Sequence, residues 1–170
     1  MGSAWVGPTG RVHAFEPSTR EYGRLLDTTT RNRLDQVSVY QVAPGARREI
    51  GALRVASEPH AGLNTFGRRF SYNGISLETT EHVTVRTLDE LAAEGAIGRV
   101  AAIKIDVEGM ELDVLQGAQG LLARDHPALV VEVIDRPVDI AFAHANLGLQ
   151  REHRFSSAEP NHDQRATDRS

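Results

Sequence analysis

Short apolar runs rich in Val, Ile and Ala alternate along the chain with stretches whose apolar residues recur at helical spacing. The apolar runs predict strands, and they occupy residues 11–16, 37–42, 83–85, 100–107 and 128–134. The run at 100–107 is nearly all apolar, as expected for a central strand covered on both faces. Strands that alternate with helices predict an α/β fold, with a mostly parallel sheet between two helix layers.

Two of the predicted helices begin at a capping-box pattern, in which a hydroxyl residue is followed three positions later by Glu. Ser18 and Glu21 match this pattern after the first strand, and Thr87 and Glu90 match it after the strand at 83–85. We therefore predict a helix start at each of these two sites.

The other segments differ in how much they reveal. Residues 111–124 have apolar positions at helical spacing and predict one helix. Residues 44–82 are rich in Gly, Pro, Asn and Ser and predict only a short strand near 52–55. Residues 151–170 are almost entirely polar, so we predict a disordered tail there and a single domain over residues 1–150.

Composition and charge exclude several classes of protein. With 170 residues, 40% of them hydrophobic, the chain can bury one sizeable core. The formal net charge of −4 argues against a nucleic-acid partner. No apolar run approaches the roughly 18 residues of a membrane span, and the first residues do not resemble a signal peptide. We predict a cytoplasmic protein with neither a nucleic-acid nor a membrane partner.

Acidic residues follow three of the predicted strands. Glu16 ends the first, Asp106 ends the strand at 100–107 with Glu108 two residues on, and either Glu132 or Asp135 ends the last. Ligands of open parallel sheets bind outside the carboxyl ends of the strands, so these acids are expected to converge on one edge. Glu16 has the position of an acid that accepts hydrogen bonds from ribose hydroxyls.

Each acid also has a structural alternative. Glu16 could cap the following helix, although Ser18 is already placed for that role. Asp106 could pair with Lys104, which lies on the same strand face because it is two residues away. We favour functional roles for both, because acids at a buried or half-buried strand end more often form a site. Gly109 would permit a tight turn directly after them.

Several catalytic chemistries lack their motifs. The chain has no cysteine, which excludes disulfides, zinc thiolate sites and a cysteine nucleophile. Its seven histidines show no metal-ligand spacing, and neither a G-x-S-x-G turn nor a G-x-x-x-x-G-K-[ST] loop occurs. We predict no metal site.

The ordered segments GRVHAFEPS, VSVYQVAPG, TLDELAAEG, VAAIKIDVEGMELDVLQGAQGLL and PALVVEV together resemble the FkbM-type methyltransferases over about residues 7–135. The resemblance implies a Rossmann-like class I methyltransferase fold in three layers. It also implies S-adenosyl-L-methionine as cofactor and a small-molecule hydroxyl acceptor, a sugar or a secondary metabolite.

The resemblance also assigns roles to individual residues. It places Glu16 and Pro17 at the cofactor ribose and Ala43 where the chain passes the adenine. It places Asp106 between the methionine part of the cofactor and the acceptor, as the first candidate for a general base. Glu108 and Glu132 are the alternative bases.

The family pattern begins with an earlier strand and a glycine-rich turn, which these 170 residues do not contain. We therefore expect an N-terminally truncated fold, in which strands 11–16 and 100–107 are left with unpaired edges or pair with each other. Open edges favour self-association. The alternatives to an active enzyme are an inactive remnant that binds a partner chain and an unrelated metal-assisted hydrolase on a similar sheet.

Overall fold

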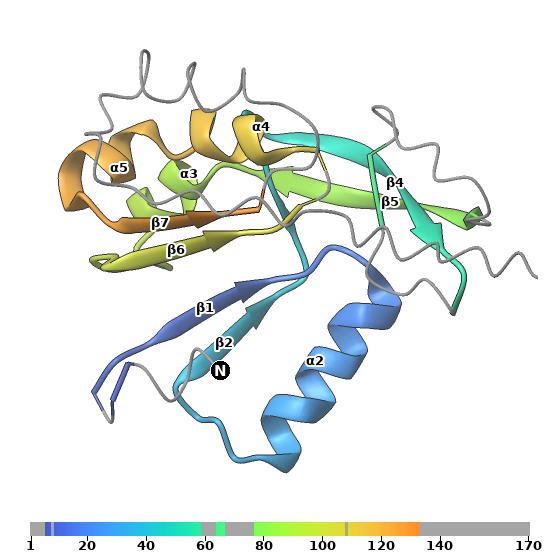
Figure 1. Cartoon of the computed structure of the whole chain (residues 1–170), viewed down its shortest axis with the longest axis horizontal. Helices are drawn as coiled ribbons and strands as arrows, with labels where there is room; N and C mark the ends of the chain where they lie inside the picture. The colour runs from blue at the N-terminus through green and yellow to red at the C-terminus, as the bar shows by residue number, and fades with distance from the viewer. Residues whose placement is uncertain (1–5, 8, 59–63, 67–76, 108, 133–170) are drawn as a thin grey trace, which may run out of the picture.

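The computed structural model describes residues 6–7, 9–58, 64–66, 77–107 and 109–132 (Figure 1). The predicted tail at 151–170 and the end of the predicted domain at residue 150 lie outside these ranges. In chain order the elements are β1 (Val12–Phe15), α2 (Thr19–Arg31), β2 (Val37–Tyr40), β3 (Ala43–Pro44), β4 (Glu49–Ala56), β5 (Leu77–Arg86), α3 (Leu88–Ala93), β6 (Ala102–Ile105), α4 (Glu111–Gln116), α5 (Gln119–Asp125) and β7 (Ala128–Val131). None of these helices combines the length and the apolar character that a membrane crossing requires.

Four strands follow the predicted α/β pattern. β1 pairs with β2 and β6 pairs with β7, both in parallel. Figure 1 shows the four strands side by side in the order β2, β1, β6, β7, with their arrows pointing the same way, α3 to α5 on one side and α2 on the other. The prediction of parallel strands covered by helices is confirmed, and the fold is Rossmann-like.

The two parallel pairs are separate two-stranded sheets. Among the described residues, no ladder joins β1 to β6. Of the two outcomes expected for these strands, the structure shows unpaired edges and not a new β1–β6 pairing. The two pairs still share packing, because Phe15 of β1 packs against the core beneath β6 and β7.

The segment after β2 is more regular than its composition predicts. β4 and β5 form a long antiparallel pair, and β3 joins β5 in parallel by two residues. The predicted strands at 52–55 and 83–85 are thus only the centres of strands of 8 and 10 residues. Pairing between β4 and β5 supplies the partner that stabilises the polar ends of both strands, and single-strand patterns do not reveal such a partner.

The predicted helix at 111–124 is broken into α4 and α5 at Gly117 and Ala118. Asp89 explains the break. Its carboxylate accepts hydrogen bonds from the backbone N–H groups of Gly120 (2.8 Å) and Leu121 (2.7 Å), and its own N–H donates to the Gly117 carbonyl (2.9 Å). In an unbroken helix Leu121 N–H would bond that same Gly117 carbonyl.

The two capping boxes have different outcomes. Thr87 and Glu90 form the predicted box, with Glu90 N–H donating to the Thr87 hydroxyl at 2.9 Å. Ser18 is the N-cap residue of α2, but the prediction that its side chain caps the helix is wrong: the Ser18 hydroxyl is buried without a hydrogen-bond partner. Carboxylates from outside the helix serve its first N–H groups instead.

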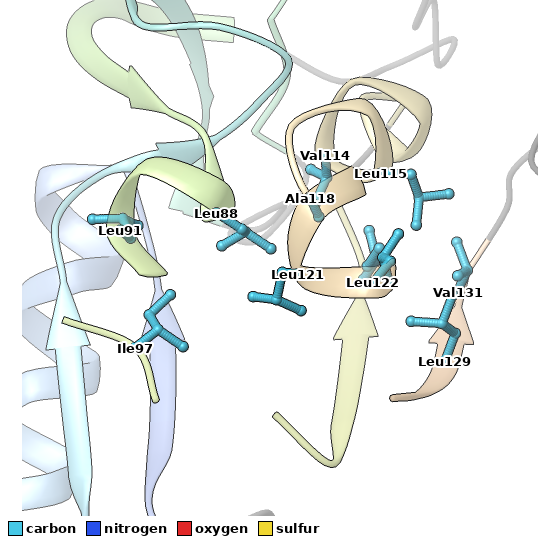
Figure 2. Packing of buried hydrophobic residues seen from close by; sticks show 11 residues of the cluster. Leu88, Leu91, Ile97, Val114, Leu115, Ala118, Leu121, Leu122, Leu129 and Val131 are labelled. Carbon is cyan, nitrogen blue, oxygen red and sulfur yellow. The ribbon is translucent and has the colours of Figure 1, made fainter. Parts of the chain in front are cut away.

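The main hydrophobic core lies between the β6–β7 pair and α3 to α5 (Figure 2). Ile105, Leu129 and Val131 contribute the strand side of this core. The opposite strand face carries Lys104 and Val130, and both are exposed. The expectation that the strand at 100–107 is covered on both faces is therefore wrong for the described residues.

Candidate functional site

Glu16 follows β1 directly and lies half-buried where that strand ends. Its Oε1 accepts a hydrogen bond from the Ser18 backbone N–H at 3.0 Å. Burial raises the pKa of Glu16, the Ser18 N–H opposes that effect, and the nearby carboxylates of Glu21 and Glu81 raise the pKa further. Its Oε2 has no hydrogen-bond partner among the described residues, which leaves one oxygen to accept hydrogen bonds from a ligand.

The helix-capping alternative for Glu16 is thus realised through one of its two oxygens. Ser18, which was expected to make this role unnecessary, does not cap through its side chain. A ribose role for the second oxygen is compatible with this geometry and stays a prediction.

The other two predicted cofactor contacts differ in accessibility. Pro17 lines an open cleft beside Glu16. Ala43 is only 3% exposed and packs in the second hydrophobic core, with Leu53, Val55, Val83 and Val85. Its side chain is therefore closed to a ligand, and its burial does not support the predicted adenine contact.

Asp106 follows β6 and is exposed, not buried or half-buried as we expected. Its Oδ2 forms an ion pair with the Nζ of Lys104, the contact named as its structural alternative. Both side chains are open to solvent, at 62% for Lys104 and 45% for Asp106. An exposed pair of this kind adds little stability, so the contact leaves a functional role open.

Asp106 and Glu132 are neighbours across the two parallel strands. The register pairs Ile105 with Val131, and the Glu132 N–H donates to the Ile105 carbonyl at 2.9 Å. The next residues along, Asp106 and Glu132, therefore lie side by side at the carboxyl ends, and both are exposed. This is the predicted convergence of acids for two of the strands. Glu108 lies outside the described residues, and no hydrogen bond or ion pair joins Glu16 to Asp106 within them.

The turn after β6 contains a buried acid that sequence reasoning missed. Gly109 has a φ of +94°, so it makes the tight turn that its glycine predicted. Glu111 is 8% exposed, and its Oε1 accepts a hydrogen bond from the Gly109 N–H at 2.9 Å. Glu111 therefore holds the turn that follows Asp106.

The sequence also gave no indication of the cleft beside Pro17. It has a volume of about 420 Å³ and is lined by Pro17, Thr19, Gln41 and residues 81–84 of β5. Glu81 accepts a hydrogen bond from the Thr19 N–H at 2.8 Å, and the Gln41 side chain donates to the Thr19 hydroxyl at 3.2 Å. The alternating polar and β-branched residues of β5 are the available signal, but that pattern predicts only a brief strand at 83–85. We refer to this feature below as the β5-edge cleft.

The described residues contain no cluster of three or more His, Asp or Glu side chains that could hold a metal ion. The half-buried Glu16 can accept hydrogen bonds from hydroxyl groups, and Asp106 and Glu132 can accept protons.

The domain has parallel strands with an acid after the first strand and a pair of acids after the two later ones. This is a Rossmann-like arrangement, a class of fold in which ligands generally bind at the carboxyl ends of the strands. A family model, the Methyltransferase FkbM domain, matches residues 3–157. The chain belongs to this family.

Two known proteins show how far the similarity extends. The chain is 31% identical over 115 residues to the hexuronic acid methyltransferase AglP of Haloferax volcanii, an alignment that covers 65% of this chain and 42% of that protein. The crystal structure of the methyltransferase FkbM of Methylobacillus flagellatus KT matches 81% of this chain and 29% of its own, with a TM-score of 0.54 and 19% identity. The chain therefore spans less than half the length of these two proteins.

Proposed function

We propose that this domain binds S-adenosyl-L-methionine and transfers its methyl group to a hydroxyl of a small molecule, a sugar or a secondary metabolite. Family membership supports methyl transfer as the reaction class. The name of the Haloferax relative makes sugar hydroxyls the first acceptors to test. The single observation that supports cofactor binding in this chain is the half-buried Glu16 carboxylate, with one oxygen free, at the end of β1.

The chain's residues fit the ribose part of that cofactor. A cis pair of ribose hydroxyls needs a hydrogen-bond acceptor, and Oε2 of Glu16 provides one in a partly desolvated position, where such bonds are stronger. The cofactor supplies an electrophilic methyl group on a sulfonium. The protein's contribution is to hold the acceptor oxygen in line with that methyl group, because positioning supplies much of the rate in a displacement.

In this proposal Asp106 takes the proton of the acceptor hydroxyl as its oxygen attacks the methyl carbon. Bound S-adenosyl-L-methionine would supply the methyl carbon, and its carbon–sulfur bond would be the one broken, with release of a neutral thioether. Asp106 suits this role because its carboxylate is exposed at a strand end, where a substrate can reach it. Glu132, its neighbour across the strands, is the alternative base, and Glu108 is a second one whose position lies outside the described residues.

Cofactor binding is tested by titration calorimetry with S-adenosyl-L-methionine on the 170-residue chain, on Glu16→Ala and on Glu49→Ala. Glu49 is the matched control, because it is an exposed acid on β4 whose side chain pairs with Arg47. We expect micromolar binding to the unmodified chain and to the control, and a loss of at least tenfold in Glu16→Ala. Equal affinity in all three proteins would remove Glu16 from the site.

The second candidate function, a binding module without catalysis, has one observation in its favour. The edges of β1 and β6 that face each other have no strand partner among the described residues, and such edges accept strands from other chains. A folded chain that binds no S-adenosyl-L-methionine but forms dimers in sedimentation experiments would favour this alternative.

A further inference from the structure

The β5-edge cleft lies one residue beyond the proposed ribose acid, because Pro17 follows Glu16 and lines its wall. Two contacts from Thr19 fix the separation of its walls. One joins the start of α2 to Glu81 of β5, and the other joins it to Gln41 at the end of β2. The cleft is therefore built from three elements that are held together before any ligand arrives.

Backbone geometry shows what β5 presents to this cleft. The Arg86 carbonyl of β5 accepts a hydrogen bond from the Gly45 N–H, on the side of β3 (3.0 Å). On an antiparallel strand, alternate residues direct both their N–H and their C=O to the same side. His82 and Thr84 therefore direct their backbone groups to the side of β3, while Val83 faces β4.

The register of β4 gives the same assignment independently. Arg54 exchanges both backbone hydrogen bonds with Thr65, on the side of β4 away from β5 (2.8 and 3.0 Å). Leu53 and Gly51 must then face β5, and they are the register partners of Glu81 and Val83. His82 and Thr84 are thus the residues with outward groups, and β3 pairs with β5 only at Val85 and Arg86.

We propose that the β5-edge cleft holds the adenine ring of the cofactor, and that the His82 carbonyl and the Thr84 N–H bind its 6-amino group and its N1. This inference rests on the proposed function. The C=O of one outward residue and the N–H of the next outward residue offer an acceptor beside a donor. Adenine offers the complementary donor and acceptor on one edge.

The charge of the lining agrees with a neutral ring. Glu81 is the only carboxylate among the lining residues, and no Lys or Arg lines the cleft. A phosphate group would be repelled there, whereas an uncharged base would not. If backbone groups of β5 bind the adenine, a contact between the adenine and the buried Ala43 side chain is not required.

The proposal is tested with S-adenosylhomocysteine and S-inosylhomocysteine, which differ only in the base. Hypoxanthine has an oxygen and an N–H where adenine has the amino group and the unprotonated N1, so it would place like groups against the β5 edge. We expect the unmodified chain to bind the adenine ligand at least tenfold more tightly, because a mismatched pair leaves polar groups unsatisfied.

Thr84→Pro removes the outward N–H, and proline is tolerated on a strand where its nitrogen faces no ladder partner. We expect this variant to lose about tenfold in affinity for the adenine ligand and most of the discrimination between the two bases. Thr84→Val keeps the N–H and should bind as the unmodified chain does. Val83→Pro is the control for folding, because the Val83 N–H belongs to the ladder with β4. This variant therefore shows the effect of a proline that removes a hydrogen bond between strands and not an outward N–H.

Hydrogen exchange on the unmodified chain decides the matter even if Thr84→Pro does not fold. S-adenosylhomocysteine should slow exchange of the Thr84 amide and leave the already protected Val83 amide unchanged. Tight binding of both ligands with no change at Thr84 would overturn the inference and leave the proposed function intact. Failure of the folded chain to bind either ligand would overturn both.

Discussion

Gly117 is the position at which the structure makes its sharpest prediction about stability. A Cβ placed on Gly117 would overlap the carbonyl oxygen of Gly45 and approach the Cβ of Thr87 to 3.2 Å. The φ of Gly117 is −81°, which any residue can adopt, so the penalty for alanine is purely steric. The residues it would displace are Gly45, which follows β3, and Thr87, the N-cap residue of α3.

The size of the effect follows from the two interactions that would be disturbed. Overpacking of this kind costs about 1–3 kcal/mol in free energy of unfolding. Moving Gly117 also weakens the 2.9 Å hydrogen bond from the Asp89 N–H to its carbonyl, a loss of about 1 kcal/mol. We expect Gly117→Ala to destabilise the chain by about 2–4 kcal/mol, or to lower Tm by about 5–15 °C.

Gly23 provides a control of opposite sign. It lies inside α2, is exposed, and has no atom within 4 Å of the position its Cβ would take. Gly23→Ala should therefore stabilise the chain by about 0.5–1 kcal/mol, because alanine loses less backbone entropy in a helix. Urea denaturation of the three proteins, followed by circular dichroism, measures both effects. A Gly117→Ala variant as stable as the unmodified chain would refute the close approach of Gly45 and Gly117.

Three further predictions concern the helix break and the site. Asp89→Ala should lower the free energy of unfolding by about 1–2 kcal/mol, since two N–H groups of α5 lose their acceptor. Asp27→Ala breaks only an exposed pair inside α2 and should not lower the urea midpoint, because alanine also favours the helix. Because the pKa of Glu16 is raised, its carboxylate is protonated at a higher pH than that of an ordinary glutamate. Ribose requires the charged form, so affinity for S-adenosylhomocysteine should fall as the pH is lowered into that range. Glu16→Gln should bind weakly, with an affinity that does not change over the same pH range. Asp106→Asn in a full-length active protein should reduce kcat sharply and leave S-adenosylhomocysteine affinity nearly unchanged, because the amide cannot take the acceptor's proton; near-normal turnover would separate Asp106 from catalysis.

Predictions from the sequence succeeded where a local pattern is sufficient. The apolar runs located β1, β2, β6 and β7, because the strand positions that pack against helices or neighbouring strands carry apolar side chains. The capping box of Thr87 and Glu90 formed because both partners lie within one turn of α3. Acids at the strand ends were also visible, since parallel strands bring their carboxyl ends to one edge.

Predictions failed where a distant residue supplies the deciding contact. The Thr19 N–H at the start of α2 donates to Glu81, which lies 62 residues further along the chain than Thr19, and the Ser18 side chain makes no cap. Asp89 divided the predicted helix at 111–124 from 31 residues away. No local pattern contains such partners, so propensity alone favoured an unbroken helix and a serine cap.

The sequence by itself determined the strand and helix order, the acids that follow the strands, and the resemblance that the family match confirms. Only the tertiary structure decided that β4 and β5 form a long antiparallel pair, that Asp106 lies beside Glu132, and that a cleft opens along the free edge of β5. The physical reason is the range of the interactions. Periodicity and capping act within a few residues, whereas register and edge exposure depend on which strands meet after the chain has folded.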